Sequence, residues 1–145
     1  MVNSKLVNVL LVEDSPSDIE LTSMAFEKFS HPNKLHVVED GEAALDFLYR
    51  RGGYHKAAEP DIILLDINIP KQSGQEVLEI IKADEKLKHI PVVILTSSAS
   101  PRDISRSYAS HANCYIIKPI DVENYFCVVD KVESFWMNTA RLPKQ

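Results

Sequence analysis

The sequence has few cysteines, no excess of positive charge and no long apolar run. Its two cysteines, Cys114 and Cys127, lack the spacing of a metal site or a redox pair, and we expect buried thiols because both lie in apolar segments. The formal net charge of −5 argues against a nucleic-acid partner, which usually requires a basic surface. No run approaches the roughly 18 apolar residues that span a bilayer, and no basic-then-apolar leader is seen. We therefore predict a cytoplasmic protein with no membrane or nucleic-acid partner.

The length of 145 residues suits one domain, which can bury roughly 68–70% of its unfolded surface around a single core. We predict one domain over residues 1–140 with an extended last helix. Residues 141–145 are expected to form a frayed C-terminal tail.

Apolar runs that predict strands alternate five times with helix signals. The predicted strands are residues 6–12, 35–38, 62–65, 91–96 and 114–119, and the predicted helices are 15 to about 29, 42–51, 75–84, a segment from 100 and 121 to about 138. The third run is apolar on both faces, as in a central strand that helices cover on both sides. This order indicates an α/β fold: a doubly wound five-stranded parallel sheet flanked by five helices. The helix that starts at Ser100 has many serines and few apolar residues, so we expect it to be marginal and able to shift.

Polar side chains follow four of the five predicted strands. Glu13 and Asp14 follow the first strand, Asp66 the third, Thr96 the fourth and Lys118 the fifth. Because parallel strands end at the same edge of a sheet, we expect these groups to lie close together. Neighbouring carboxylates repel one another unless a cation lies among them, and oxygen ligands favour a hard divalent ion. The sequence therefore predicts a Mg²⁺ site at this edge.

These groups are suited to phosphoryl transfer onto a carboxylate. A metal ion and a lysine neutralise the transferring group, and a hydroxyl donates a hydrogen bond to it. Asp66 is the best candidate for the nucleophile because its strand has the most buried pattern.

Each residue alone has a plainer interpretation. Asp66 could open a turn, and Glu13 and Asp14 could favour a helix dipole. Thr96 is a common strand residue, and Lys118 could be a solvated charge. Their coincidence at the ends of successive strands is what favours a functional site.

With these groups in place, the sequence resembles the receiver domains of two-component response regulators over residues 5–138. The matching motifs are Val12-Glu13-Asp14-Ser15, Leu64-Leu65-Asp66-Ile67-Asn68-Ile69-Pro70 with Gly74, Leu95-Thr96-Ser97, and Tyr115-Ile116-Ile117-Lys118-Pro119. The resemblance implies a flavodoxin-like fold of the receiver type. It also implies that a sensor histidine kinase phosphorylates Asp66.

The resemblance assigns further roles at the site. Asp14 and Asp66 would bind Mg²⁺, Glu13 would help through water, and Asn68 would contribute its backbone carbonyl. Thr96 and Lys118 would hold the phosphoryl oxygens.

The resemblance also implies two conformational features. Tyr115 would be an aromatic switch that turns inward when Thr96 moves toward the phosphoryl group. The peptide bond between Lys118 and Pro119 would be cis, which is true of only about 5–6% of X–Pro bonds in folded proteins.

Two departures from the minimal receiver pattern point to a subgroup. The loop from Gly52 to Pro60 is longer, and the last helix is extended with no effector domain expected after it. Both features resemble the stand-alone receivers that are paired with cyanobacterial-type phytochrome kinases, which implies a phytochrome-type kinase partner and a homodimer through the face formed by the last helices and strand. Phe135 and Trp136 are possible dimer contacts, and local core packing is the alternative interpretation.

Two other functions compete with a signalling domain that is not an enzyme. A Mg²⁺-dependent phosphohydrolase of the haloacid dehalogenase type needs a second aspartate two residues after the nucleophile, but that position is Asn68. A flavodoxin-like cofactor binder needs a phosphate loop after the first strand, where Glu13 and Asp14 would repel phosphate. Phosphate-ester turnover would identify the hydrolase, because a receiver accepts at most one phosphoryl group per chain.

Overall fold

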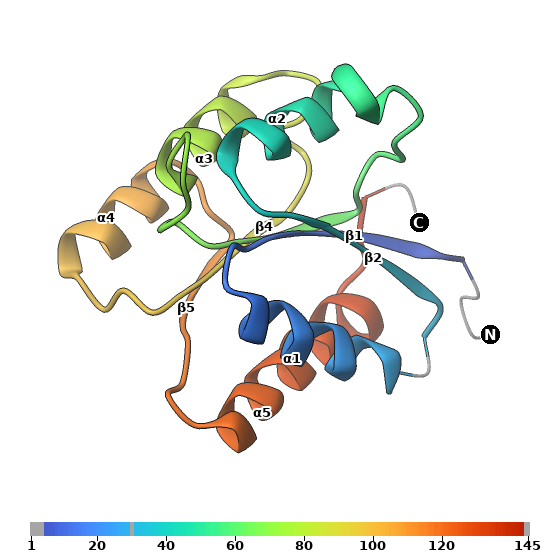
Figure 1. Ribbon diagram of the computed structural model, residues 1–145, viewed down its shortest axis with the longest axis vertical. Coiled ribbons are helices and arrows are strands. Elements are labelled where there is room, and N and C mark those ends of the chain that lie inside the picture. Colours follow the sequence, from blue (N-terminus) through green and yellow to red (C-terminus); the bar gives the residue numbers. More distant parts are fainter. Residues whose placement is uncertain (1–4, 30, 144–145) are drawn as a thin grey trace.

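The computed structural model describes residues 5–29 and 31–143. Five parallel strands form one sheet in the order β2-β1-β3-β4-β5 (Figure 1). The strands are β1 (Val7–Val12), β2 (Asn33–Val38), β3 (Ile62–Leu65), β4 (Val92–Thr96) and β5 (Cys114–Ile117). The predicted doubly wound five-stranded parallel sheet is confirmed.

The strand register aligns the carboxyl ends of the central strands. Val12 of β1 lies beside Leu65 of β3, and Thr96 of β4 lies beside Ile117 of β5. All four residues of β3 are buried, as expected for a strand covered on both faces. The residues that follow β1, β3 and β5 therefore reach one edge of the sheet together.

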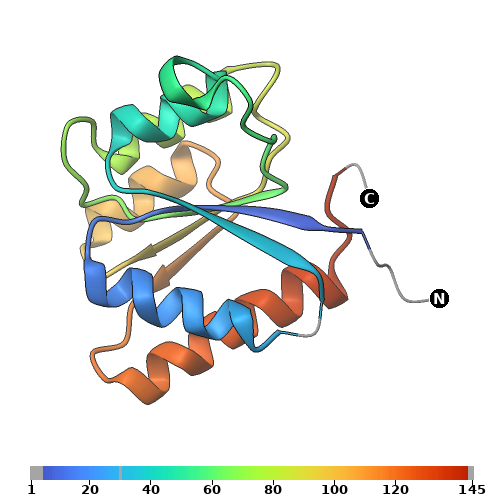
Figure 2. The same ribbon diagram turned by 45° about the vertical axis from the view of Figure 1, so that its right-hand side comes forward.

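Helices cover both faces of the sheet (Figures 1 and 2). Helices α1 (Pro16–Glu27) and α5 (Val122–Glu133) pack side by side on one face. Helices α2 (Gly41–Tyr49), α3 (Gly74–Ala83) and α4 (Pro101–Ala109) cover the other face, with α4 beside α3 and β5. Each face has its own apolar core, one around Leu10, Ile63 and Leu78 and the other around Leu11, Phe26 and Val129.

Side-chain caps fix where the helices begin. Ser15 accepts a hydrogen bond from the backbone N–H of Asp18, and Ser73 forms a capping box with Glu76. Such a cap stabilises a helix by typically about 1 kcal/mol because it satisfies a backbone donor that has no partner within the helix. These caps set the directions in which α1 and α3 leave the edge where the polar groups gather.

Helix α4 has little apolar contact with the rest of the protein. Ser107 is its one buried residue, and the buried Gln75 side chain of α3 donates hydrogen bonds to the Ser107 hydroxyl (3.0 Å) and the Asp103 carbonyl (3.1 Å). Hydrogen bonds, and not buried apolar area, therefore hold α4 against α3. The expectation that α4 can shift remains a prediction.

The C-terminal region differs from expectation in two places. Helix α5 continues as a π-helical segment, η2 (Ser134–Thr139), and Leu142 packs into the core beneath α1 and α5 instead of fraying. Lys144 and Gln145 of the predicted tail lie outside the described residues.

Cys127 is exposed and Cys114 is half-buried, so the prediction of two buried thiols was wrong. The apolar face of α5 turns Val129 inward and leaves Cys127 outside.

The segment from Gly52 to Pro60 connects α2 to β3. It begins with a single 3-10 turn, η1 (Gly52–Tyr54), whose Tyr54 ring centroid lies 5.5 Å from that of Phe47 in α2.

Within the described part of the chain, no helix is both long and apolar enough to cross a membrane.

Candidate functional site

Asp66 lies directly after β3, and its carboxylate is buried. Its backbone N–H donates to the Val12 carbonyl (3.0 Å), and its Oδ1 accepts from the backbone N–H of Asn68 (3.0 Å). Gly74 permits this arrangement, because a Cβ atom there would lie 2.4 Å from the Asp66 carbonyl oxygen. The carboxylate is thus held in one orientation by the strand and by the turn that follows it.

Glu13 and Asp14 bring two more carboxylates to Asp66. One oxygen from each of these three side chains lies within 4.8 Å of the other two. Glu13 is buried and Asp14 is exposed, so the cluster is open to solvent on one side. Burial raises the pKa of Glu13 to about 6 against the lowering effect of Lys118. Three oxygen donors at this spacing, with an open side for waters, fit a hard divalent cation such as Mg²⁺.

Lys118 extends from the loop after β5 into the same cluster. Its Nζ donates to Oδ2 of Asp66 (2.9 Å), to Oδ2 of Asp18 (2.9 Å) and to Oε1 of Glu13. Burial alone would lower the pKa of Lys118, but its bonds to these carboxylates outweigh that effect and raise it. The ammonium is therefore a permanent cation against one oxygen of Asp66, while the other oxygen is held by Asn68.

Asp18 is a site residue that sequence reasoning missed. It lies in the first turn of α1 and is not among the predicted site residues, yet its carboxylate binds the same ammonium as Asp66. Its position in the first turn of the helix that leaves this edge of the sheet could have suggested that it lies near Asp14 and Asp66.

Thr96 ends β4 as predicted and is fully buried. Its Oγ1 accepts a long hydrogen bond from the backbone N–H of Ser98 (3.4 Å), and the Ser98 hydroxyl donates to Oδ2 of Asp103 in α4 (2.5 Å). The Tyr115 hydroxyl donates to the Ser98 carbonyl (2.9 Å), and the Tyr115 N–H donates to the hydroxyl of Tyr108 in α4 (3.1 Å). The loop after Thr96 is therefore connected both to α4 and to the predicted switch residue on β5.

The predicted cis bond between Lys118 and Pro119 is wrong. There are no cis peptide bonds in the described chain, so this bond is trans. The trans form is the lower-energy state of an X–Pro bond by about 0.5–1 kcal/mol. Lys118 reaches the carboxylates from this trans backbone.

Phe135 and Trp136 lie away from this cluster, at the end of α5 and on the side of β5. Phe135 is half-exposed, and its ring packs edge-to-face on Trp136 with ring centroids 5.2 Å apart. Together with Cys114, Ile116 and Val132 they line an apolar hollow of about 260 Å³. The two rings thus pack on each other and also border an apolar surface.

Comparison with known proteins identifies the relatives of this chain. The family model for the response regulator receiver domain matches residues 9–130. Response regulator Rcp1 of Synechocystis sp. is 42% identical over 135 residues, which make up 93% of this chain and 92% of the relative. The crystal structure of the phosphorylated cyanobacterial phytochrome response regulator RcpA superposes with a TM-score of 0.94 at 43% identity and covers 97% of this chain and 100% of that one. The Mn(2+)-bound form of Rcp1 gives a TM-score of 0.92 at 42% identity, over 94% of this chain and 99% of that one.

Proposed function

This chain belongs to the family of response regulator receiver domains, and we propose that it is a stand-alone phospho-acceptor whose Asp66 receives a phosphoryl group from a sensor histidine kinase. The observation that carries the proposal is the contact between the Lys118 ammonium and one oxygen of the buried Asp66 carboxylate, beside Glu13 and Asp14. A buried carboxylate with a fixed cation on one oxygen is oriented for nucleophilic attack.

In the proposed reaction, an oxygen of Asp66 forms a bond to phosphorus while the P–N bond of a kinase phosphohistidine breaks. The electron pair of that bond returns to the imidazole ring, and the product is an acyl phosphate on Asp66. Lys118 balances the negative charge of the transferring group, and the Thr96 hydroxyl donates a hydrogen bond to one of its oxygens. Both groups start from buried positions where water competes little.

We propose that Asp14, Asp66 and the Asn68 backbone carbonyl hold Mg²⁺, with Glu13 acting through water. A bound divalent ion would neutralise charge on the acceptor and on the phosphoryl oxygens. Two observations support this assignment: the close spacing of the three carboxylates, and the Mn(2+)-bound form of the relative Rcp1.

The proposed kinase partner is of the phytochrome type. RcpA is a phytochrome response regulator, and this chain is similar to it over nearly its whole length. We expect this exchange to take place in the cytoplasm, where the free thiols of Cys114 and Cys127 would remain reduced.

The proposed output is a change in binding surface. Thr96 and Tyr115 form the switch: movement of Thr96 toward the phosphoryl group would displace Ser98, and Ser98 contacts both Tyr115 and α4. Because α4 is held mainly by polar contacts, a small change in that loop can shift its position.

The proposed homodimer uses the face formed by β5 and α5. The apolar hollow beside Phe135 and Trp136 gives this face a surface that a second copy can cover. Substituting Phe135→Asp should shift the sedimentation of the protein toward the monomer, whereas Asp130→Asn on the same helix should leave it unchanged.

The decisive experiment offers acetyl phosphate and Mg²⁺ to the wild type, to Asp66→Asn and to the matched control Asp130→Asn. We expect one phosphoryl group per chain in the wild type and in the control, and none in Asp66→Asn, measured by intact-protein mass spectrometry. Continuous turnover of a phosphate ester by the wild type would instead indicate a hydrolase. Equal labelling of Asp66→Asn would place the acceptor elsewhere and overturn the proposal.

A further inference from the structure

The strand β2 forms one edge of the sheet and pairs with β1 alone. The Pro32 carbonyl accepts a hydrogen bond from the backbone N–H of Val7 in β1, and the Val38 carbonyl accepts one from the N–H of Glu13 just after β1 (both 3.0 Å). In a parallel ladder, every second residue turns its backbone groups to the same neighbour, so the N–H and C=O groups of Leu35 and Val37 point away from β1. No described residue pairs with this outward side, which leaves a row of donors and acceptors that can accept another strand.

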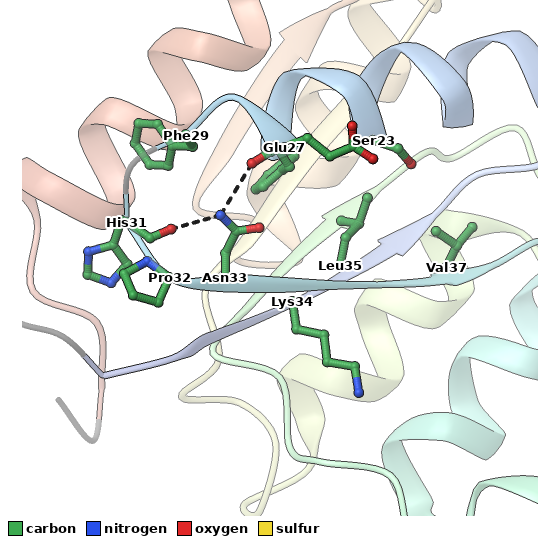
Figure 3. Close-up of a pocket in the computed structure, with 10 residues that line it drawn as sticks. Ser23, Glu27, Phe29, His31, Pro32, Asn33, Lys34, Leu35 and Val37 are labelled. Carbon is green, nitrogen blue, oxygen red and sulfur yellow. Dashed lines mark hydrogen bonds between the residues drawn. The ribbon is translucent and has the colours of Figure 1, made fainter.

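A hollow flanks the edge strand on each face of the sheet. On the α1 side a hollow of about 500 Å³ is lined by Phe26, Phe29, Leu35 and Val37. On the α2 side a hollow of about 490 Å³ is lined by Lys34, His36, Phe47, Tyr54 and Lys56. Figure 3 shows Leu35 and Val37 pointing toward α1 while Lys34 points to the opposite side of the strand. A strand added at this edge would place its own side chains alternately over the two hollows.

The two hollows differ in chemistry. On the α2 side Lys34 and Lys56 are exposed, and none of the described residues that line that hollow carries a carboxylate. The His36 and Tyr54 rings both pack on Phe47, with centroids 5.3 and 5.5 Å from it. This positive hollow stands out on a chain whose formal net charge is −5. On the α1 side the strand presents the apolar side chains of Leu35 and Val37, and Glu27 of α1 lines the same hollow.

We propose that the outward edge of β2 binds an extended segment of a partner protein, with carboxylate side chains over Lys34 and Lys56 and apolar side chains over Leu35 and Val37. Main-chain hydrogen bonds to Leu35 and Val37 hold the segment, and the alternation of side chains selects it. The loop from Gly52 to Pro60 then has a role, because Tyr54 and Lys56 complete the positive hollow.

A second copy of this chain is a poor occupant of the edge. In a symmetric antiparallel pair of β2 strands, the α2 sides of the two sheets lie on the same face of the dimer. The Lys34 side chains of the two copies would therefore lie on one face, near both Lys56 side chains. Like charges across paired strands destabilise the pairing. Charge complementarity therefore favours an acidic partner segment.

The test uses a synthetic peptide, acetyl-Ser-Glu-Val-Glu-Val-Glu-Ser-amide, with binding measured by titration calorimetry and backbone amides followed by NMR. We expect saturable binding that slows the hydrogen exchange of the Leu35 and Val37 amides. Lys34→Glu should weaken binding by about tenfold or more, and the matched control Arg102→Glu on α4, beside the opposite edge of the sheet, by less than about twofold, because interface charges act over short distances in salt. A peptide with lysine in place of each glutamate should not bind measurably.

A backbone variant tests the strand addition itself. Val37→Pro removes an outward N–H donor at an edge position where proline is tolerated, and it should abolish binding while the circular dichroism of the fold persists. The proposal is overturned if the peptide fails to bind at millimolar concentration, if Lys34→Glu binds it as well as the wild type, or if the protected amides lie on β5. Concentration-dependent association of the free protein through β2 would also overturn it in favour of a self-pairing edge. None of these readouts depends on phosphorylation of Asp66, so this proposal and the proposed function can fail separately.

Discussion

Two buried carboxylic acids, Glu13 and Glu133, have opposite surroundings. Glu13 is 2% exposed and is bonded to the Lys118 ammonium and to the backbone N–H of Ser15. Glu133, at the end of α5, is 1% exposed, and neither of its carboxylate oxygens has a hydrogen-bond partner among the residues described. Burial raises the pKa of both groups, to about 6 for Glu13 and to about 8 for Glu133, where Asp130 adds a smaller effect.

The difference teaches how this fold handles buried charge. A fixed ammonium lets Glu13 and Asp66 share a small volume, which keeps the proposed acceptor site assembled. Glu133 has no ion pair with any described residue, so burial favours its neutral form and ionising it costs stability. Lys118 therefore balances the buried carboxylates at the rim of the sheet, whereas we expect the unpaired acid at the end of α5 to make the stability of the fold depend on pH.

The largest expected effect comes from removing the shared cation with Lys118→Met. Glu13 and Asp66 would then be buried without a positive partner, and the free energy of unfolding should fall by roughly 3–5 kcal/mol at neutral pH without added metal. Urea denaturation followed by circular dichroism measures this loss, with Lys86→Met as an exposed control. A loss no larger than that of the control would mean that the ammonium does not hold the cluster together.

The second effect comes from neutralising the unpaired acid with Glu133→Gln. The pKa of Glu133 in the folded protein is raised above its ordinary value of 4.5. Its contribution to the free energy of unfolding is therefore most favourable below pH 4.5, and that contribution is lost as the pH rises to about 8. Glu133→Gln should therefore stabilise the protein by roughly 1–3 kcal/mol at pH 9 and change little at pH 4.5.

The measurement for Glu133 is the difference in unfolding free energy between variant and wild type across this pH range. Glu123→Gln, in the first turn of the same helix, is the matched control and should show no such slope. A pH-independent difference for Glu133→Gln would mean that Glu133 is ionised in the folded protein throughout.

A smaller effect is expected from adding Mg²⁺ to the wild type. If the carboxylates at the rim bind the ion in the folded state alone, a concentration ten times Kd should raise the free energy of unfolding by about 1.4 kcal/mol. Asp14→Asn removes a proposed ligand and should abolish most of this increase, while Glu133→Gln should retain it. Thermal denaturation with Mg²⁺ and with EDTA decides the question, and an equal increase in Asp14→Asn would exclude this site.

The smallest effect is expected for Asp18→Asn. Its carboxylate bonds to Lys118 at 2.9 Å, but a quarter of the side chain is exposed, so solvent screens the pair. We expect a loss of less than about 1 kcal/mol of unfolding free energy and continued labelling of Asp66 by acetyl phosphate. Loss of labelling in Asp18→Asn would show that Asp18 is needed to position Lys118.

Local sequence patterns predicted most of the fold. Runs of apolar residues placed all five strands, and Ser15 and Ser100 mark predicted helix starts that the structure contains. Parallel strand ends then predicted that Glu13, Asp14, Asp66 and Lys118 meet, and their side chains do lie together. These inferences succeed because helix and strand periodicity and capping act within a few residues of the chain.

Other features needed the packed molecule. The bond between Asp18 and Lys118 joins residues 100 positions apart, and the isolation of Glu133 depends on what surrounds the end of α5. The exposure of Cys127 and the trans bond before Pro119 also went against the sequence-based expectation.

The sequence by itself determined the order of strands and helices along the chain and the identity of the groups at the rim of the sheet. Only the tertiary structure decided which acids obtained a cation, which acid has no polar partner among the described residues and which strand edge stayed open. The reason is that electrostatic and packing partners are chosen by distance in space, and residues far apart in the chain come within that distance only after the helices have packed on the sheet.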